Sequence, residues 1–241
     1  MIQESFEKNI IVSQYECDFQ NRMKPSAIMR QVQQVSTDHC DALGITAQVY
    51  EETHTAFLLA KLSLEVYKDI RVGEAVKLVT RPALPVRAVY NRYTGLYDED
   101  GALAAAMDSR WILIDTRTRR ILRRPPEGID WPFIAPVTQE HSLTMEKPDD
   151  LESVGTVKVT YSRVDQNRHL NNTEYADIIC DCLPIEHFQN GSVKKLVLSY
   201  HHEARFGEEL TLYRAALADA SGYYLCGMLG EQNCFEANIR F

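Results

Sequence analysis

Tyr15–Met23 (YECDFQNRM) and Tyr161–His169 (YSRVDQNRH) decide the fold, because these two stretches match each other along one chain of 241 residues. Their shared core is Tyr-x4-Gln-Asn-Arg. Such self-similarity is the sequence sign of a repeated structural unit. The matches below occur in the same order in both halves, and one match alone would be attributable to chance.

Further matches pair a segment of the first half with a segment of the second. They are Leu62-x-Leu64 with Leu196-x-Leu198, Arg71–Glu74 (RVGE) with Arg205–Glu208 (RFGE) and, more weakly, Gly101-x5-Met107 with Gly222-x5-Met228. Ordered matches of this kind predict that the chain holds two copies of one module.

Each copy has a helical pattern directly after the Gln-Asn-Arg motif. In the first copy Pro25 suits the first helical position and Gly44 suits the C-terminal stop. In the second copy Asn171 and Glu174 resemble a capping box. Apolar residues recur at helical spacing behind both starts: Ile28, Val32, Val35 and Leu43, then Tyr175, Ile178, Ile179 and Cys182.

Several β-like runs follow each predicted helix. They are Ala56–Val66, Ala75–Thr80, Val86–Tyr97, Ala102–Ile114, Lys194–Tyr200, Glu209–Leu217 and Tyr223–Met228. One helix followed by consecutive strands predicts an α+β fold with an antiparallel sheet, because parallel sheets need alternating strands and helices.

The prolines mark the boundary between the copies. Five of the nine fall between the two halves, at positions 125, 126, 132, 136 and 148. Clustered prolines interrupt regular structure. We therefore expect an N-terminal module over residues 1–125, a linker over 126–152 and a C-terminal module over 153–241.

Composition excludes several classes of protein. A net charge of −8 argues against a general nucleic-acid binder, since such proteins need a basic face. No apolar run approaches the roughly 20 residues that span a bilayer, and the first residues lack the pattern of a signal peptide. Six cysteines without a CxxC pair fit small buried side chains in a reducing compartment. These features predict a cytoplasmic protein.

One basic stretch departs from the acidic composition. It contains Arg117, Arg119, Arg120, Arg123 and Arg124, with no acidic residue among them. The stretch is either a solvated loop after a strand or a docking surface for an acidic partner, because local charge steers encounter even against the net charge.

The two copies differ where ionisable groups stand. In the match above Asp165 aligns with Phe19, and His169 aligns with Met23. Loss of both groups from one copy suggests an active site that is present only in the second. The alternative is structural, because Asp and Asn also shape turns and cap helices, and for Asn171 and Asn172 we favour it.

The position ahead of a helix suits acyl chemistry. Unpaired N–H groups of the first helical turn stabilise a developing oxyanion. Asp165 could activate water or attack directly, and His169 could orient or shuttle protons. Glu203 is a second acidic candidate, although its counterpart Asp69 is also acidic. His201 and His202 directly follow the predicted strand Lys194–Tyr200. Adjacent side chains of an extended chain face opposite ways, so we expect no metal site there and no cofactor.

The spacing Asp165-x-Asn167-x-His169-x-Asn171-Asn172, followed by Leu198-x-Tyr200-x-x-Glu203, resembles the acyl-acyl-carrier-protein (acyl-ACP) thioesterases. Trp111–Arg120 (WILIDTRTRR) is also similar to a strand and turn of that family. The resemblance runs over nearly the whole chain.

The resemblance implies two tandem hotdog modules, each a long helix wrapped by an antiparallel sheet. It implies hydrolysis of fatty acyl thioesters on acyl carrier protein by a network of Asp165, Asn167, His169 and Glu203. The first module would hold the acyl chain, and the arginines would dock the acidic carrier. The plant enzymes have a cysteine after the glutamate, whereas this chain has Ala204, so the resemblance implies water attack without a cysteine nucleophile.

Two other functions fit the same residues. One is a hotdog thioesterase that acts on acyl-CoA, and the other is an acyl-binding protein without catalysis. The two fused modules already supply one hotdog interface, which is compatible with a monomer and with a further homodimer.

Overall fold

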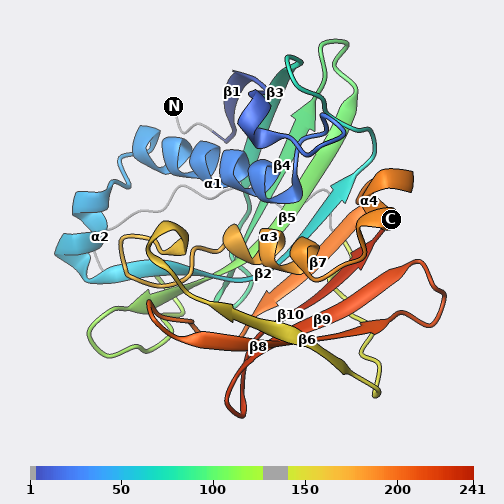
Figure 1. Ribbon diagram of the computed structural model, residues 1–241. Helices are drawn as coiled ribbons and strands as arrows, with labels where there is room; N and C mark the ends of the chain where they lie inside the picture. Colours follow the sequence, from blue (N-terminus) through green and yellow to red (C-terminus); the bar gives the residue numbers. More distant parts are fainter. Residues whose placement is uncertain (1–3, 127–140) are drawn as a thin grey trace.

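The computed structural model describes residues 4–126 and 141–241 as one ten-stranded antiparallel sheet with its helices on one face (Figure 1). The first half contains β1 (Phe6–Ile11), α1 (Pro25–Ala42), α2 (Ala47–Thr53), β2 (Thr55–Val66), β3 (Ala75–Pro82), β4 (Val89–Tyr97) and β5 (Leu103–Asp115). The second contains β6 (Glu152–Lys158), α3 (Glu174–Asp181), α4 (Ile185–Asn190), β7 (Lys195–Tyr200), β8 (Glu209–Ala216), β9 (Gly222–Leu229) and β10 (Gln232–Arg240).

The strand order shows that the chain is duplicated. Across the sheet it runs β1-β3-β4-β5-β2-β7-β10-β9-β8-β6, so each half has the same connectivity and the second is reversed in space. The α+β class is confirmed, as is the antiparallel sheet around a helix that a hotdog module requires.

The two halves join at β2 and β7 in the middle of the sheet. Leu62 pairs with Leu198 and Leu64 pairs with Leu196, and all four side chains are fully buried. Because Leu62 and Leu64 are the sequence counterparts of Leu196 and Leu198, this register has a local twofold axis. A self-complementary contact of this kind is what a symmetric dimer uses, here within one chain.

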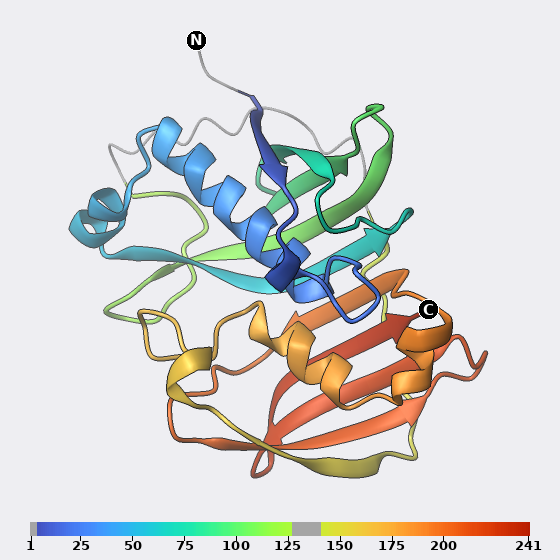
Figure 2. The same cartoon turned by 45° about the horizontal axis from the view of Figure 1, so that its top comes forward.

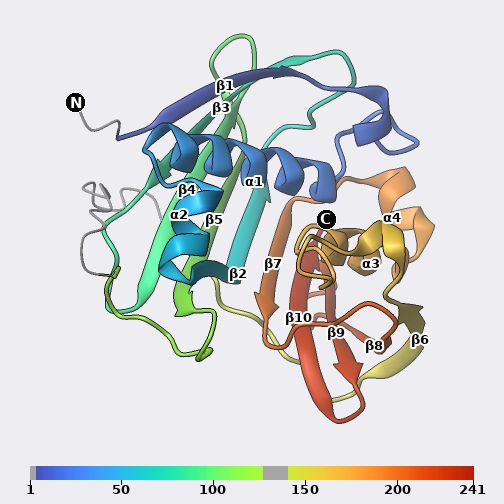
Figure 3. The same ribbon diagram turned by 90° about the vertical axis from the view of Figure 1, so that its left-hand side faces the viewer.

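The long helix α1 lies against the sheet and beside α3 (Figures 2 and 3). Its buried face includes Ile28, Val32 and Val35, as the helical spacing predicts. Pro25 occupies the first turn, and Gly44 follows the C-terminus with a φ of 79°. Hydrogen bonds also connect α1 with α3 across the two halves. The Arg30 guanidinium donates to the Glu174 carboxylate at 2.7 Å and to the Asp177 carboxylate at 2.9 Å.

The RVGE and RFGE match is confirmed by equivalent hydrogen bonds. The Gly73 N–H donates to the Val12 carbonyl at 2.9 Å, and the Gly207 N–H donates to the Val159 carbonyl at 2.9 Å. Both glycines have positive φ values, 84° and 89°, at which a residue with a side chain would be strained. Each motif therefore ends the connection that follows β2 or β7 with one tight turn.

The weakest match, between Met107 and Met228, is wrong. Met107 lies on β5, whose counterpart by strand order is β10, whereas Met228 lies on β9. The expected capping box is also wrong, because Thr173 is the N-cap residue of α3. Asn171 instead accepts bonds from the Thr173 N–H at 3.0 Å and hydroxyl at 2.8 Å, which shapes the turn ahead of the helix.

Three strands and two short helices were not predicted from the sequence. They are β1, β6, β10, α2 and α4. Both β1 and β6 are edge strands, with one sheet partner each. Edge strands bury less apolar surface, so their residues do not show the apolar runs by which strands are recognised.

The described part of the expected linker packs across both halves. The His141 N–H donates to the Asp108 carboxylate at 3.0 Å, and the Glu146 N–H donates to the Asn238 amide oxygen at 2.7 Å. Asp108 lies on β5 of the first half and Asn238 on β10 of the second. The linker prolines 132 and 136 lie outside the described residues, and the module limits 125/126 and 152/153 stay predictions.

Within the described ranges, no helix is both long enough and apolar enough to cross a membrane.

Replacing Leu198 with Ala should lower the free energy of unfolding by about 2–5 kcal/mol, because it opens a cavity at the joint between the halves. Chemical denaturation followed by circular dichroism measures the change. Leu84→Ala is the control, since that side chain is 48% exposed. Equal effects of the two substitutions would contradict the central role of the β2–β7 contact.

Candidate active site

The turn between β6 and α3 carries three of the predicted site residues. Its Asp165 N–H donates to the His169 carbonyl at 2.9 Å, which closes the turn. The Asp165 Oδ1 atom accepts the N–H groups of Asn167 at 2.8 Å and His169 at 3.2 Å. Arg168 lies between them with a φ of 63°. The Asp165 carboxylate therefore fixes the backbone that presents Asn167 and His169.

The loop after β7 brings Glu203 to this turn. The Leu170 N–H donates to the Ala204 carbonyl at 2.7 Å, so the two segments run side by side. As a result the His169 Nε2 atom lies 3.6 Å from Glu203 Oε2. Both side chains are partly exposed, at 21% and 26%. A carboxylate beside an imidazole is an arrangement suited to proton transfer.

The structure thus brings Asn167 and His169 to Asp165 and Glu203 to His169, whereas Asn171 and Asn172 serve the backbone. The Asn172 carbonyl accepts the Tyr200 hydroxyl at 2.7 Å. Burial raises the pKa of Tyr200 well above its usual value, so this hydroxyl keeps its proton. The sequence did not assign this role to Tyr200, which ties β7 to the residues ahead of α3.

The first copy keeps the same turn, which corrects the sequence match by one residue. Asp165 is equivalent to Asp18 and not to Phe19. The reason is that residues with the same backbone hydrogen bonds occupy the same place in the two turns, even where the shared Gln-Asn-Arg motif aligns them differently. In the first copy the bonds are Asp18 N–H to Arg22 O at 2.7 Å, Gln20 N–H to Asp18 Oδ1 at 2.8 Å and Arg22 N–H to Asp18 Oδ1 at 2.9 Å.

The turn aspartate is therefore not what distinguishes the two copies. The differences are Gln20 in place of Asn167, Arg22 in place of His169 and Asp69 in place of Glu203. The Arg22 guanidinium bonds Asp18 and the carbonyls of Phe188 and Gly191 in the second half. In the first copy an arginine that holds the two halves together stands where the second copy has an imidazole.

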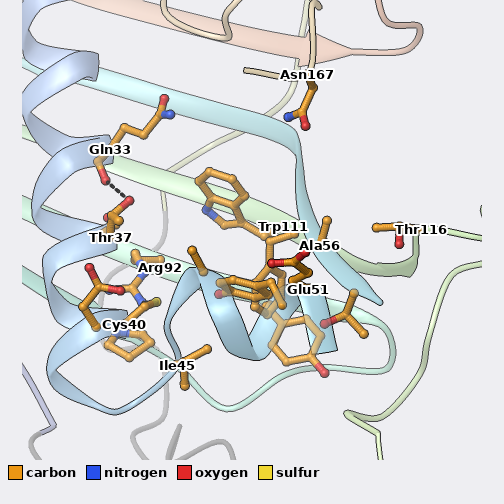
Figure 4. Close-up of a pocket in the computed structure, with 18 of the residues that line it drawn as sticks. Gln33, Thr37, Cys40, Ile45, Glu51, Ala56, Arg92, Trp111, Thr116 and Asn167 are labelled. Atoms are coloured by element: carbon orange, nitrogen blue, oxygen red, sulfur yellow. Dashed lines mark hydrogen bonds between the residues drawn. The ribbon is translucent and has the colours of Figure 1, made fainter. Parts of the chain in front are cut away.

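A cavity of about 670 Å³ reaches this turn at Gln166 and Asn167 and extends into the first half, whereas Asp165, His169 and Glu203 are not among its lining residues. Gln166 and Asn167 line it from the second half, and the rest of the lining comes from α1, α2, β2, β3, β4 and β5 and from the loop residues Ile45, His54 and Thr116. In Figure 4 Asn167 and Ile45 lie at opposite ends of the labelled side chains, with Trp111 between them. Volumes of this order hold small molecules.

The wall of the cavity is mixed in polarity. Tyr50, Phe57, Tyr90 and Trp111 form its aromatic part. The Arg92 guanidinium is buried, and it contacts His39 Nδ1 at 3.3 Å and Cys40 Sγ at 3.5 Å. Burial lowers the pKa of Arg92 from its usual value.

The arginines of the predicted docking surface differ in their contacts. Arg117 lies 3.7 Å from Asp115, and the Arg119 Nη2 atom lies 2.7 Å from Glu203 Oε2. Arg120, Arg123 and Arg124 are exposed and form no ion pair within the described part of the chain. Arg119 thus contacts the candidate site, which the sequence did not predict.

The two histidines considered for a metal do not come together with a third ligand. His201 Nε2 lies 3.0 Å from Glu236 Oε2, and His202 is exposed. Among residues 4–126 and 141–241, no group of three or more His, Cys, Asp or Glu side chains has the geometry to hold a metal.

Comparison with known proteins gives the family. The model of the acyl-ACP thioesterase N-terminal domain matches residues 3–131, and the model of its C-terminal domain matches residues 146–237. A palmitoyl-acyl carrier protein thioesterase of Gossypium hirsutum is 22% identical over 95% of this chain, and the alignment spans 59% of that relative's length.

Solved structures share the fold. An acyl-ACP thioesterase from Bacteroides thetaiotaomicron superposes with a TM-score of 0.85 over 99% of this chain and 98% of its own, at 20% identity. The 12:0-ACP thioesterase from Umbellularia californica gives 0.81 over 100% and 98%, at 17% identity. Since both family models match in order, and the first alone covers more than half of the sequence, the chain belongs to the acyl-ACP thioesterase family.

Proposed function

We propose that the protein hydrolyses fatty acyl thioesters of acyl carrier protein to free fatty acid and the carrier. The observation that carries the proposal is the His169–Glu203 pair, 3.6 Å apart, because His169 shares its turn with Gln166 and Asn167, which line a cavity of about 670 Å³. Family membership supplies the substrate class, and the pair supplies groups that can move a proton.

In the proposed reaction a water oxygen attacks the thioester carbonyl carbon. The Glu203 carboxylate and His169 imidazole take the proton of that water, and the tetrahedral intermediate expels the thiolate as the C–S bond breaks. The thiolate leaves with a proton returned by the same pair. Asp165 holds the turn, and Asn167 presents its amide to the cavity. Ala204 follows Glu203, so no cysteine stands there.

The acyl chain would lie in the first half, against the aromatic wall formed by Tyr50, Phe57, Tyr90 and Trp111. This division of work agrees with the differences between the copies, since only the second has the imidazole. The exposed arginines after β5 would dock the acidic carrier. We also propose that the protein works in the cytosol, and the six cysteines, all free, support this.

The first test is hydrolysis of one acyl group on two carriers. With short to long saturated chains, acyl carrier protein thioesters should give higher kcat/KM than the matching CoA thioesters. Faster turnover of the CoA thioesters would favour the acyl-CoA thioesterase instead.

Replacing His169 with Ala should lower kcat roughly 10²- to 10⁴-fold, the usual contribution of a proton-transferring side chain. His202→Ala is the matched control, because that histidine is exposed and lies on the same loop as Glu203. Unchanged turnover of His169→Ala would favour an acyl-binding protein without catalysis or a different site.

The duplicated turn offers a second matched pair. Asp18→Ala and Asp165→Ala should each lower the free energy of unfolding by about 1 kcal/mol, because each removes a carboxylate that accepts backbone N–H groups. Only Asp165→Ala should lower kcat, since only that turn carries His169. Equal losses of kcat in both variants would contradict the assignment of the site to the second half.

Charge reversal tests the docking surface. Arg123→Glu combined with Arg124→Glu should raise KM for the acyl carrier protein thioester roughly tenfold at low salt, because local charge governs encounter. The change in kcat should be negligible. Lys77→Glu on β3 is the control, and an equal effect on KM would mean that net charge, and not this surface, matters.

A further inference from the structure

The ion pair between Arg119 and Glu203 joins residues from different halves of the chain. Arg119 follows β5 in the first half, and Glu203 follows β7 in the second. Their side chains are 56% and 26% exposed, and the N–O distance is 2.7 Å. An exposed ion pair contributes only about 0–1 kcal/mol to stability. The contact therefore contributes little to the stability of the fold.

The backbone around Arg119 is held in a specific turn. Arg119 has a φ of 59°, which costs free energy for a residue with a side chain, and its N–H donates to the Asp115 carbonyl at 2.8 Å. The Asp115 Oδ1 atom accepts the N–H groups of Arg117 at 2.9 Å and Thr118 at 2.8 Å. These backbone bonds, that of Thr118 first, lower the pKa of Asp115.

The same turn is fixed to the rest of the first half. The Asp115 N–H donates to the Arg120 carbonyl at 2.9 Å, and the Thr116 N–H donates to the His54 carbonyl at 2.8 Å. Thr116 also lines the cavity, together with Asn167 from the other half. The turn is therefore part of the wall of the site.

One oxygen of Glu203 lies between the two halves. Its Oε2 atom is 2.7 Å from Arg119 Nη2 and 3.6 Å from His169 Nε2. A glutamate on a loop has several rotamers, and a charge-assisted bond restricts them. Among residues 4–126 and 141–241, His169 is the only other side chain within ion-pair distance of the Glu203 carboxylate.

In the first copy, the carboxylate at the position equivalent to Glu203 has longer contacts with cations. Asp69 replaces Glu203, and its nearest cations are Lys194 at 3.7 Å and Arg71 at 3.8 Å. Lys194 belongs to the other half, so this pair also crosses between the halves. The short contact, however, occurs only where the imidazole is present.

We propose that Arg119 is a positioning residue of the active site, which orients the Glu203 carboxylate toward His169 from the opposite half of the chain. Arg119 then belongs to the site and not to the docking surface, which is left to Arg120, Arg123 and Arg124. The inference rests on the proposed thioester hydrolysis for its kinetic test and on the Glu203 geometry for its structural one.

The kinetic test uses Arg119→Met, which keeps an unbranched, largely apolar side chain but removes the guanidinium charge. We expect kcat for an acyl carrier protein thioester to fall roughly 10- to 100-fold, since misplacement of a reacting group by about 1 Å has effects of this size. KM should stay within about twofold, and Arg119→Lys should recover part of kcat because a charge returns. Arg117→Met, in the same turn, should leave kcat unchanged, because the Arg117 side chain pairs with Asp115 and not with Glu203.

A double-variant cycle shows whether Arg119 acts through Glu203. In a Glu203→Ala background, Arg119→Met should cause no further loss of kcat, because the group that it orients is gone. A loss that multiplies with that of Glu203→Ala, or a rise in KM with kcat unchanged, would overturn the proposal and return Arg119 to the docking surface.

The structural test does not depend on turnover. A crystal structure of Arg119→Met should show the Glu203 carboxylate displaced from His169 or in more than one rotamer, with the melting temperature of the variant close to that of the unmodified protein. A Glu203 side chain that keeps its single position overturns the proposal. Absence of hydrolysis by the unmodified protein would instead overturn the proposed function, and the crystal structure would still decide the role of Arg119.

Discussion

The antiparallel pairing of β2 with β7 is the contact on which the rest of the structure depends. It buries Leu62, Leu64, Leu196 and Leu198 completely and converts two five-stranded sheets into one of ten strands. Because the register is symmetric, the turn ahead of the helix in each half faces the helix of the other half. Both the cavity and the ion pair of Arg119 with Glu203 follow from this arrangement.

The site is consequently shared between the halves. The second half contributes Asp165, Asn167, His169 and Glu203, while the first contributes Arg119 and most of the cavity wall. Neither half alone contains both the proton-transferring pair and the space for an acyl chain. In the proposed reaction the second half would therefore depend on the first, which has no imidazole at the equivalent position.

Divergence of the copies required few changes because the backbone frame stayed the same. Asp18 and Asp165 accept equivalent N–H groups, and both turns reach the neighbouring loop through the same kind of bond, from Met23 to Ile70 and from Leu170 to Ala204. Arg22 stands where the second copy has His169, and its guanidinium fastens α4 and its following loop to the first half.

The sequence by itself determined the duplication, the α+β class, one helix after each Gln-Asn-Arg motif and the candidates Asp165 and His169, because these depend on local periodicity and on residue type, and the family resemblance added Asn167 and Glu203. The length of the helices was decided by the tertiary structure, since α1 has 18 residues and α3 has eight. Tertiary structure decided what depends on backbone hydrogen bonding between distant segments. It shifted the alignment of the turns by one residue, so that Asp165 corresponds to Asp18, and it separated Arg119 from the other arginines. Letters alone do not carry that information, since a shared Gln-Asn-Arg does not record which N–H meets which carbonyl.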